Sequence, residues 1–245
     1  MPKYWTKMFR WSWLAGIVLA AAVLSACGQT PPAAAQAESA LGSDGPTNAQ
    51  RRFGADTPRL VVLGDSLTAG LGLELAEAYP SRLQEYLDAA GYHVQIVNAG
   101  VSGDTTAGAL RRLDWALSGG AEILVVALGG NDGLRGLPVD QIKKNLSHII
   151  MVAKSRGIKV LLAGMEAPPN FGEVYTTAFR DVFRELAREH DIASVPFLLE
   201  GVAGVPNLNQ PDGIHPTAEG AARVAEHVWP AVERLVQQMT MGDGQ

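Results

Sequence analysis

A serine near the start of the chain and an aspartate–histidine pair near its end supply the side chains that nucleophilic catalysis requires. Ser66 lies in the segment GDSLTAG, and Asp212 and His215 lie in QPDGIHPT, which has too much proline and glycine for a helix or a central strand. A serine hydroxyl attacks a carbonyl only when a base takes its proton, and a carboxylate can orient that base. These residue types predict acyl transfer, with Ser66 as nucleophile, His215 as base and Asp212 as the group that orients the imidazole.

Acyl transfer also needs hydrogen-bond donors for the oxyanion that develops in the transition state. The backbone N–H groups of Ser66 and Gly103 and the side-chain amide of Asn131 are the candidate donors. Gly103 lies in NAGVSGDTT and Asn131 in GGNDGLRG. A glycine at 103 lets a substrate approach the backbone closely.

Two further segments are candidates for contact with a substrate. Leu134 and Arg135 belong to the segment 133–138, which is either an apolar flap over an acyl chain or a plain surface connection. Pro169, Asn170 and Phe171 follow a predicted strand and are the other candidates.

Short apolar runs that alternate with amphipathic stretches must position these residues. The expected strands are 60–63, 94–97, 123–128, 159–163 and 193–199. The expected helices are 80–90, 106–117, 140–156, 177–190 and a long final helix that Thr217 caps, with a kink expected at Pro230. This alternation predicts an α/β fold, a three-layer α/β/α sandwich around a five-stranded parallel sheet. Every candidate residue follows a strand, at the edge of the sheet where such folds bind ligands.

The N-terminal residues predict export rather than fold. Basic residues precede an apolar run at 14–26, which is too short to span a bilayer and typical of a signal peptide. The run ends in Leu-Ser-Ala-Cys, which resembles the lipobox of bacterial lipoproteins, so we expect residues 1–27 to be a signal peptide and Cys27 to be lipidated; the alternative is an ordinary secretory signal. Residues 28–58 read as a flexible tether, 59–240 as the folded domain and 241–245 as a short tail. We therefore expect a lipid-anchored protein of the bacterial envelope that faces the periplasm.

The four segments GDSLTAG, NAGVSGDTT, GGNDGLRG and DGIHPTAEG occur in this order, and together they resemble the SGNH, or GDSL, serine hydrolases. The resemblance runs from about Leu60 to the last helix and is strongest to the bacterial arylesterase, thioesterase I and lysophospholipase group. It implies a flavodoxin-like fold, a Ser66–His215–Asp212 triad and an oxyanion hole that includes Gly103 and Asn131. We expect no cofactor and no metal. The α/β-hydrolase elbow is excluded, because Gly-x-Ser-x-Gly would need glycine where Thr68 stands. We therefore expect Ser66 on a looser loop and in a shallower site.

Two other functions remain open. A metal-dependent phosphoesterase would gather a cation among Asp65, Asp104, Asn131, Asp132, Asp212 and His215, although only one histidine is expected at this edge of the sheet. A non-catalytic envelope module on the same fold is the other alternative. The net charge of −5 and the lack of a basic cluster give no sign of a nucleic-acid partner, and we expect a monomer acting on small esters, thioesters or lysophospholipids.

Overall fold

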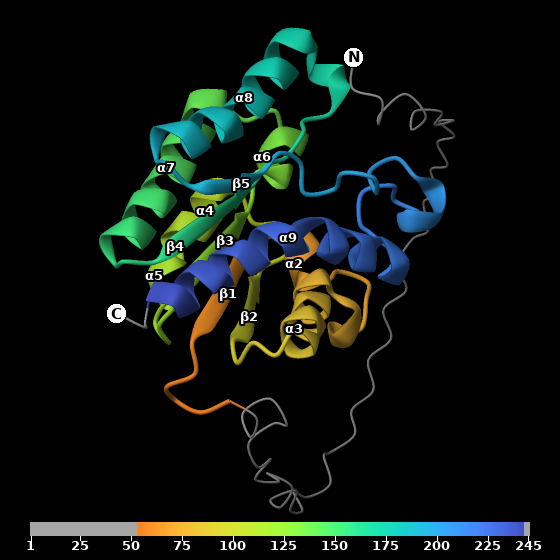
Figure 1. Cartoon of the computed structure of the whole chain (residues 1–245). Coiled ribbons are helices and arrows are strands. Elements are labelled where there is room, and N and C mark those ends of the chain that lie inside the picture. Colours follow the sequence, from red (N-terminus) through yellow and green to blue (C-terminus); the bar gives the residue numbers. More distant parts are fainter. Residues whose placement is uncertain (1–52, 243–245) are drawn as a thin grey trace, which may run out of the picture. The chain divides into compact units, whose positions relative to one another are not determined.

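The computed structural model describes residues 53–242 (Figure 1), and from Asp56 onward they belong to one compact unit. The predicted signal peptide, Cys27, the tether as far as residue 52 and residues 243–245 lie outside the described residues. No helix within residues 53–242 is long and apolar enough to cross a membrane.

A five-stranded sheet forms the centre of this unit, and all its strand pairs are parallel. Its strands are β1 (Arg59–Gly64), β2 (Gln95–Gly100), β3 (Ile123–Ala127), β4 (Lys159–Ala163) and β5 (Ala193–Val195). Every residue of β3 is buried, as is every residue of β1 after Arg59, because helices cover both faces of the sheet. The strand order β2-β1-β3-β4-β5 is the flavodoxin order.

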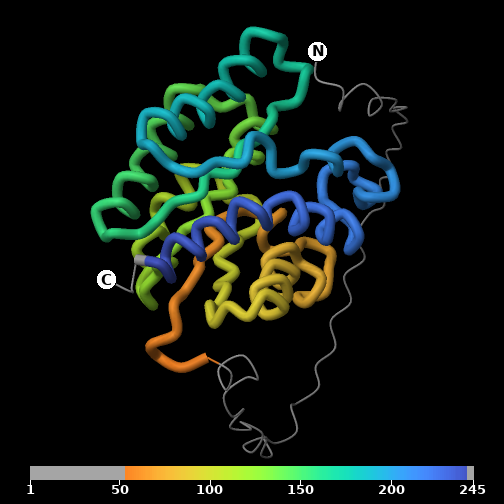
Figure 2. The backbone as a smooth tube through the Cα atoms, in the orientation of Figure 1, coloured from red at the N-terminus to blue at the C-terminus, as the bar shows by residue number. Residues whose placement is uncertain are grey.

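The helices cover the two faces of the sheet (Figures 1 and 2). On one face α3 (Tyr79–Ala89) packs against α9 (Ala218–Gly242), and on the other α7 (Val139–Ser155) packs against α4 (Thr106–Arg111) and α8 (Glu173–Glu189). The predicted three-layer sandwich is therefore confirmed. The shorter elements are α2 (Ser66–Ala69), α5 (Leu113–Ala116), α6 (Gly130–Leu134) and the 3-10 turns η1 (Leu75–Glu77), η2 (Pro169–Phe171) and η3 (Pro206–Leu208).

Several helices and strands begin or end at other residues than predicted. The helix expected over 106–117 is broken at Arg112, whose guanidinium donates to Asp104 Oδ2 at 2.6 Å and to the carbonyl of Gly64 at 2.9 Å. The fifth strand ends at Val195 instead of residue 199, because Pro196 has no N–H to continue the ladder. Helix α8 begins at Glu173, before the expected start at 177, and α9 passes Pro230 and runs to Gly242, into the expected tail.

Candidate active site

Ser66 and Asn131 follow two neighbouring strands at the point where the order of the sheet reverses. Strand β1 pairs with β2 on one side and with β3 on the other, so the connections after β1 and β3 leave the sheet at a topological switch point. Open α/β sheets bind ligands at this place. The sequence therefore brings both residues to the same edge of the sheet.

Ser66 lies at the start of a short helix, not on the looser loop that we expected. Asp65 is the N-cap of α2, and its Oδ1 accepts a hydrogen bond from the Leu67 N–H at 3.0 Å. The backbone of α2 lies so close to the end of β2 that a Cβ on Gly100 would be 2.3 Å from Ala69 N. This close approach fixes the serine against the sheet.

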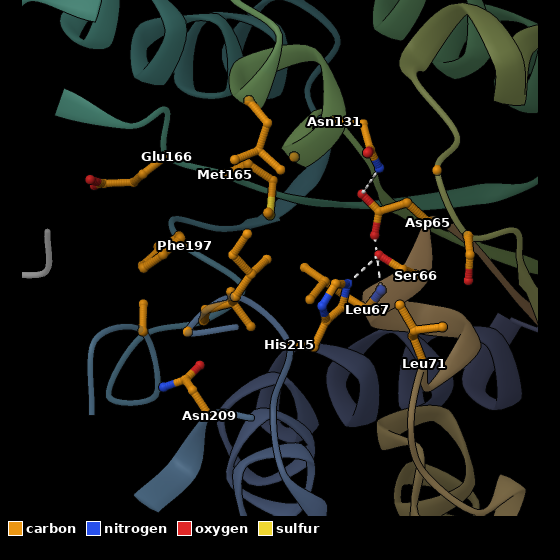
Figure 3. Close-up of a pocket in the computed structure, with 18 of the residues that line it drawn as sticks. Asp65, Ser66, Leu67, Leu71, Asn131, Met165, Glu166, Phe197, Asn209 and His215 are labelled. Carbon is orange, nitrogen blue, oxygen red and sulfur yellow. Dashed lines mark hydrogen bonds between the residues drawn. The ribbon is translucent and has the colours of Figure 1, made fainter. Parts of the chain in front are cut away.

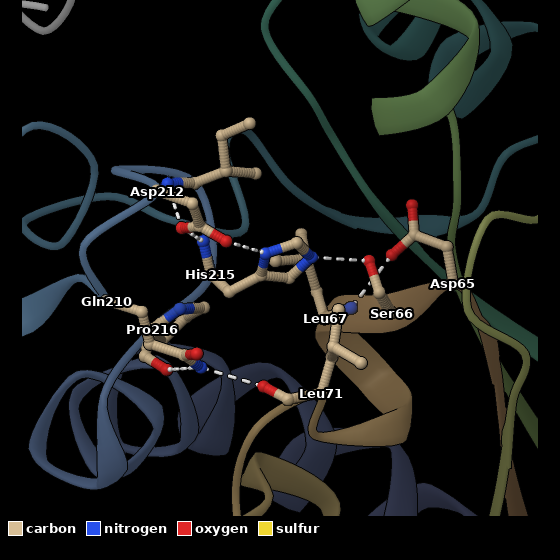
Figure 4. Close-up of polar contacts among 9 residues, drawn as sticks. Asp65, Ser66, Leu67, Leu71, Gln210, Asp212, His215 and Pro216 are labelled. Carbon is tan, nitrogen blue, oxygen red and sulfur yellow. Dashed lines mark hydrogen bonds and ion pairs between the residues drawn. The ribbon is translucent and has the colours of Figure 1, made fainter. Parts of the chain in front are cut away.

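Ser66, His215 and Asp212 form a continuous chain of hydrogen bonds (Figure 4). His215 Nδ1 lies 2.6 Å from Asp212 Oδ2, and His215 Nε2 lies 2.8 Å from Ser66 Oγ. A carboxylate only accepts, so Nδ1 carries the proton and donates it; Nε2 of the neutral ring then accepts from the Ser66 hydroxyl. This is the tautomer in which an imidazole can take the serine proton.

Asp212 stays ionised in this arrangement. Burial alone would raise the pKa of Asp212, but hydrogen bonds from the His215 ring and from the N–H groups of Ile214 and His215 lower it below its ordinary value. The two N–H groups donate to Asp212 Oδ1 at 2.9 and 3.0 Å, which leaves Oδ2 for the imidazole. The carboxylate is thus held in place and charged where an imidazolium would form.

Asp65 is a second carboxylate next to the nucleophile, and it is only 2% exposed. Burial raises the pKa of Asp65 to about 6, although hydrogen bonds from the Leu67 N–H and the Asn131 amide oppose the rise. Sequence reasoning considered Asp65 only as a metal ligand. Aspartate is a preferred N-cap residue, so an aspartate directly before Ser66 was the sequence signal for a structural role beside the nucleophile.

The three expected oxyanion donors, Ser66, Gly103 and Asn131, line one cavity. Asn131 Nδ2 lies 3.3 Å from Asp65 Oδ2, and an amide nitrogen has a second hydrogen to donate elsewhere (Figure 3). Gly103 has a φ of 84°, which favours glycine, and its carbonyl accepts a hydrogen bond from Arg135 Nη2 at 3.2 Å.

A buried polar network connects the two segments that carry these donors. Asp132, next to Asn131, accepts hydrogen bonds from the Thr106 N–H at 2.9 Å and from the Thr106 hydroxyl at 2.7 Å. Asn145 on α7 donates to the same hydroxyl at 3.0 Å. Because Thr106 follows Gly103 closely in the chain, this network fixes the Gly103 segment relative to Asn131.

The carboxylates that a metal site would use have other partners. Asp132 is bonded to Thr106, and Asp104 pairs with Arg112 at 2.6 Å. Within residues 53–242, no three side chains of histidine, cysteine, aspartate or glutamate are grouped so that they could hold a metal ion.

The cavity beside Ser66 has a volume of about 260 Å³ and mostly apolar walls (Figure 3). Its apolar side chains include Leu71, Leu134, Met165, Phe197, Leu199 and Ile214. Away from Ser66 the wall includes Glu166, whose carboxylate accepts two hydrogen bonds from Arg180 at 3.0 and 3.3 Å.

The structure brings only one of the five predicted substrate-contact residues to this cavity. Leu134 is part of its wall, whereas Arg135 bonds to Gly103. Pro169, Asn170 and Phe171 form η2 and are not among the described residues that line the cavity. Phe171 instead packs against Tyr175, with ring centroids 5.3 Å apart.

A comparison with models of known protein families matches residues 62–223 to the GDSL-like lipase/acylhydrolase family. The chain belongs to this family. The family that the four sequence segments predicted is thus confirmed.

Named relatives of this GDSL-like hydrolase agree on the class of reaction. It is 45% identical over 178 residues to Esterase TesA of Pseudomonas aeruginosa, a match that covers 72% of this chain and 89% of that protein. It is 38% identical to the Arylesterase of Vibrio mimicus, over 69% of this chain and 86% of that one. It is 35% identical to Thioesterase 1/protease 1/lysophospholipase L1 of Escherichia coli (strain K12), over 76% of this chain and 88% of that protein. The predicted class, a carboxylic ester hydrolase, is therefore confirmed.

The fold of this GDSL-like hydrolase also matches solved structures. The crystal structure of TesA superposes with a TM-score of 0.70 at 44% sequence identity, covering 72% of this chain and 99% of that one. The comparisons give no support to a metal-dependent phosphoesterase or to a non-catalytic module.

Proposed function

We propose that this esterase cleaves carboxylic esters and thioesters with short or medium acyl groups, through an acyl-enzyme on Ser66. The observation that carries the proposal is the hydrogen-bonded chain Ser66–His215–Asp212 at the wall of an apolar cavity. A nucleophile with its base at 2.8 Å is ready for attack, and the apolar wall excludes water from an acyl chain.

The reaction proceeds in two halves. Ser66 Oγ attacks the carbonyl carbon while its proton moves to His215 Nε2, and Asp212 stabilises the imidazolium. The N–H groups of Ser66 and Gly103 and the amide of Asn131 bind the oxyanion. His215 then protonates the leaving alcohol or thiol, and the acyl group stays on Ser66. Water, deprotonated by His215, hydrolyses the acyl-enzyme and restores the serine.

The size of the cavity supports acyl groups of medium length. The cavity volume of about 260 Å³ and the mostly apolar walls fit the chain of a short or medium acyl group. The predicted lipid anchor at Cys27 and the tether after it fit an enzyme that is held at the bacterial envelope and faces the periplasm. We propose that it acts there as a monomer.

Two measurements test this function. Rates with p-nitrophenyl esters and acyl-CoA thioesters of increasing chain length should reach a maximum at a short or medium chain length and fall for longer chains. A phosphonate ester should label the wild type and Ser102→Ala, in which another serine of the cavity wall is removed, but not Ser66→Ala. Labelling of Ser66→Ala would contradict the assignment of the nucleophile, and rates that keep rising well beyond that length would contradict the chain-length proposal.

A further inference from the structure

The segment that carries His215 has to be fixed against a helix from the other end of the domain. The contacts between Asp212 and His215 are internal to this segment, because the two residues are three apart. They orient the imidazole within the segment and leave its distance from Ser66, 149 residues away, to be set by something else.

The side chain of Gln210 bridges the two segments (Figure 4). Its Nε2 donates to the carbonyl of Leu71 at 2.7 Å and to the carbonyl of Pro216 at 2.9 Å. Both hydrogens of the amide nitrogen are therefore used. The amide cannot turn over, because its oxygen would then face two carbonyl oxygens.

Gln210 closes a ring of hydrogen bonds around the catalytic pair. The Leu71 N–H donates to the Ser66 carbonyl at 3.1 Å, and the Gln210 N–H donates to the His215 carbonyl at 2.7 Å. With the Gln210–Leu71 bond, these contacts run from the main chain of Ser66 to the main chain of His215. The hydrogen bond between the two side chains completes the ring.

Gly72 shows how closely the two segments approach. It has a φ of 79°, and a Cβ at this position would lie 2.4 Å from Gln210 Oε1. The chain after Leu71 thus passes directly over the amide of Gln210, and a side chain at 72 would displace it.

We propose that Gln210 is a positioning residue that sets the distance between His215 Nε2 and Ser66 Oγ. The inference rests on the proposed roles of Ser66 and His215. A misplacement of about 1 Å costs on the order of 10²-fold in rate, so loss of the bridge should lower kcat by about 10- to 100-fold. KM should change little, because Gln210 is not among the described residues that line the cavity.

Two substitutions at this position test the proposal. Gln210→Ala removes both hydrogen bonds. Gln210→Glu keeps the volume and places carboxylate oxygens against the two carbonyls, so kcat should fall at least as far as in Gln210→Ala. The rate of phosphonate labelling of Ser66 should fall in proportion to kcat, because the activation of the serine is what is lost. In Gln210→Ala, which adds no charge, the acid limb of the pH–rate profile should keep its midpoint, because the Asp212–His215 contact is internal to its segment.

Gln84 offers a matched control. Its Nε2 donates to the carbonyl of Val94 at 3.0 Å and its Oε1 accepts from the Ile96 N–H at 2.7 Å, so it also bridges two segments, α3 and β2. Gln84→Ala should lower the melting temperature and keep the wild-type kcat.

The possible outcomes distinguish a failure of the positioning role of Gln210 from a failure of the proposed function of Ser66. Folded Gln210→Ala or Gln210→Glu with wild-type kcat and labelling rate would overturn the positioning role. A loss of kcat in Gln84→Ala as large as that in Gln210→Ala would also overturn it, since the effect would then follow stability alone. A wild type that phosphonate does not label at Ser66 would instead contradict the proposed function.

Discussion

Replacement of Asp65 by asparagine should make the protein more stable and less active. In the folded protein burial raises the pKa of Asp65 to about 6, from an ordinary value of 3.8. Ionised Asp65 is therefore unfavourable in the folded state. One pKa unit corresponds to about 1.4 kcal/mol, so the cost of the charge is about 3 kcal/mol.

The sign of this effect gives it a defined pH window. The folded protein binds the Asp65 proton more tightly than the unfolded chain does, so the favourable contribution is complete below pH 3.8. It is lost as the pH rises to about 6, and above that the cost is constant. An asparagine side chain carries no charge, so the stability gained by Asp65→Asn should be about 2.5 kcal/mol larger at about pH 8 than at about pH 4, where part of the loss has already occurred.

Urea unfolding of both proteins at these two pH values measures this difference, since other titrating groups contribute equally to both. Asp56→Asn, at an exposed carboxylate, is the matched control for replacement of a buried one. Asp65→Asn should also lower kcat, because an amide N–H would face the Asn131 amide whose hydrogen bond Asp65 Oδ2 now accepts. If the gain in stability is equal at the acid and the alkaline pH, Asp65 does not carry a buried charge and the reasoning is wrong.

Three other outcomes are expected. Ser66→Ala or His215→Ala should lower kcat by about 10⁴- to 10⁶-fold with an unchanged circular dichroism spectrum, as measured by steady-state hydrolysis of a p-nitrophenyl ester. Asn131→Ala should lower kcat by about 10²- to 10³-fold and leave KM nearly constant, and EDTA should not inhibit the wild type; EDTA inhibition reversed by divalent ions would favour the metal-dependent alternative. Radiolabelled fatty acid should enter the wild type and not Cys27→Ser, whereas a mature N-terminus beyond residue 27 would argue for an ordinary secretory signal.

The central strands β1, β3 and β4 were predictable from sequence because they are buried on both faces and therefore appear as continuous apolar runs. Helices α2 and α6 were not, since they have four and five residues, and little more than one turn shows no periodicity. The break between α4 and α5 at Arg112 could not be predicted either, because it depends on contacts with Asp104 and with the end of β1.

The catalytic residues of the site could be predicted from the sequence, but the residues that position them could not. Ser66, Asp212 and His215 carry chemistry that few other residue types can supply, so their segments stand out in the sequence. Gln210 is an ordinary polar residue in a loop, and its partner Leu71 lies 139 residues away. Only the fold shows that the Gln210 amide bonds both to Leu71, after the Ser66 helix, and to Pro216, in the His215 segment.

The order of the elements along the chain has a consequence for the moment at which activity first appears. Strand β5 ends at Val195, so the sheet is complete before the chain reaches the segment with Asp212 and His215. A polypeptide emerging from the ribosome or from an export channel would thus have released all five strands while it still lacked its base. During synthesis, the onset of ester hydrolysis should therefore report the docking of the His215 segment and α9, which emerge after all five strands.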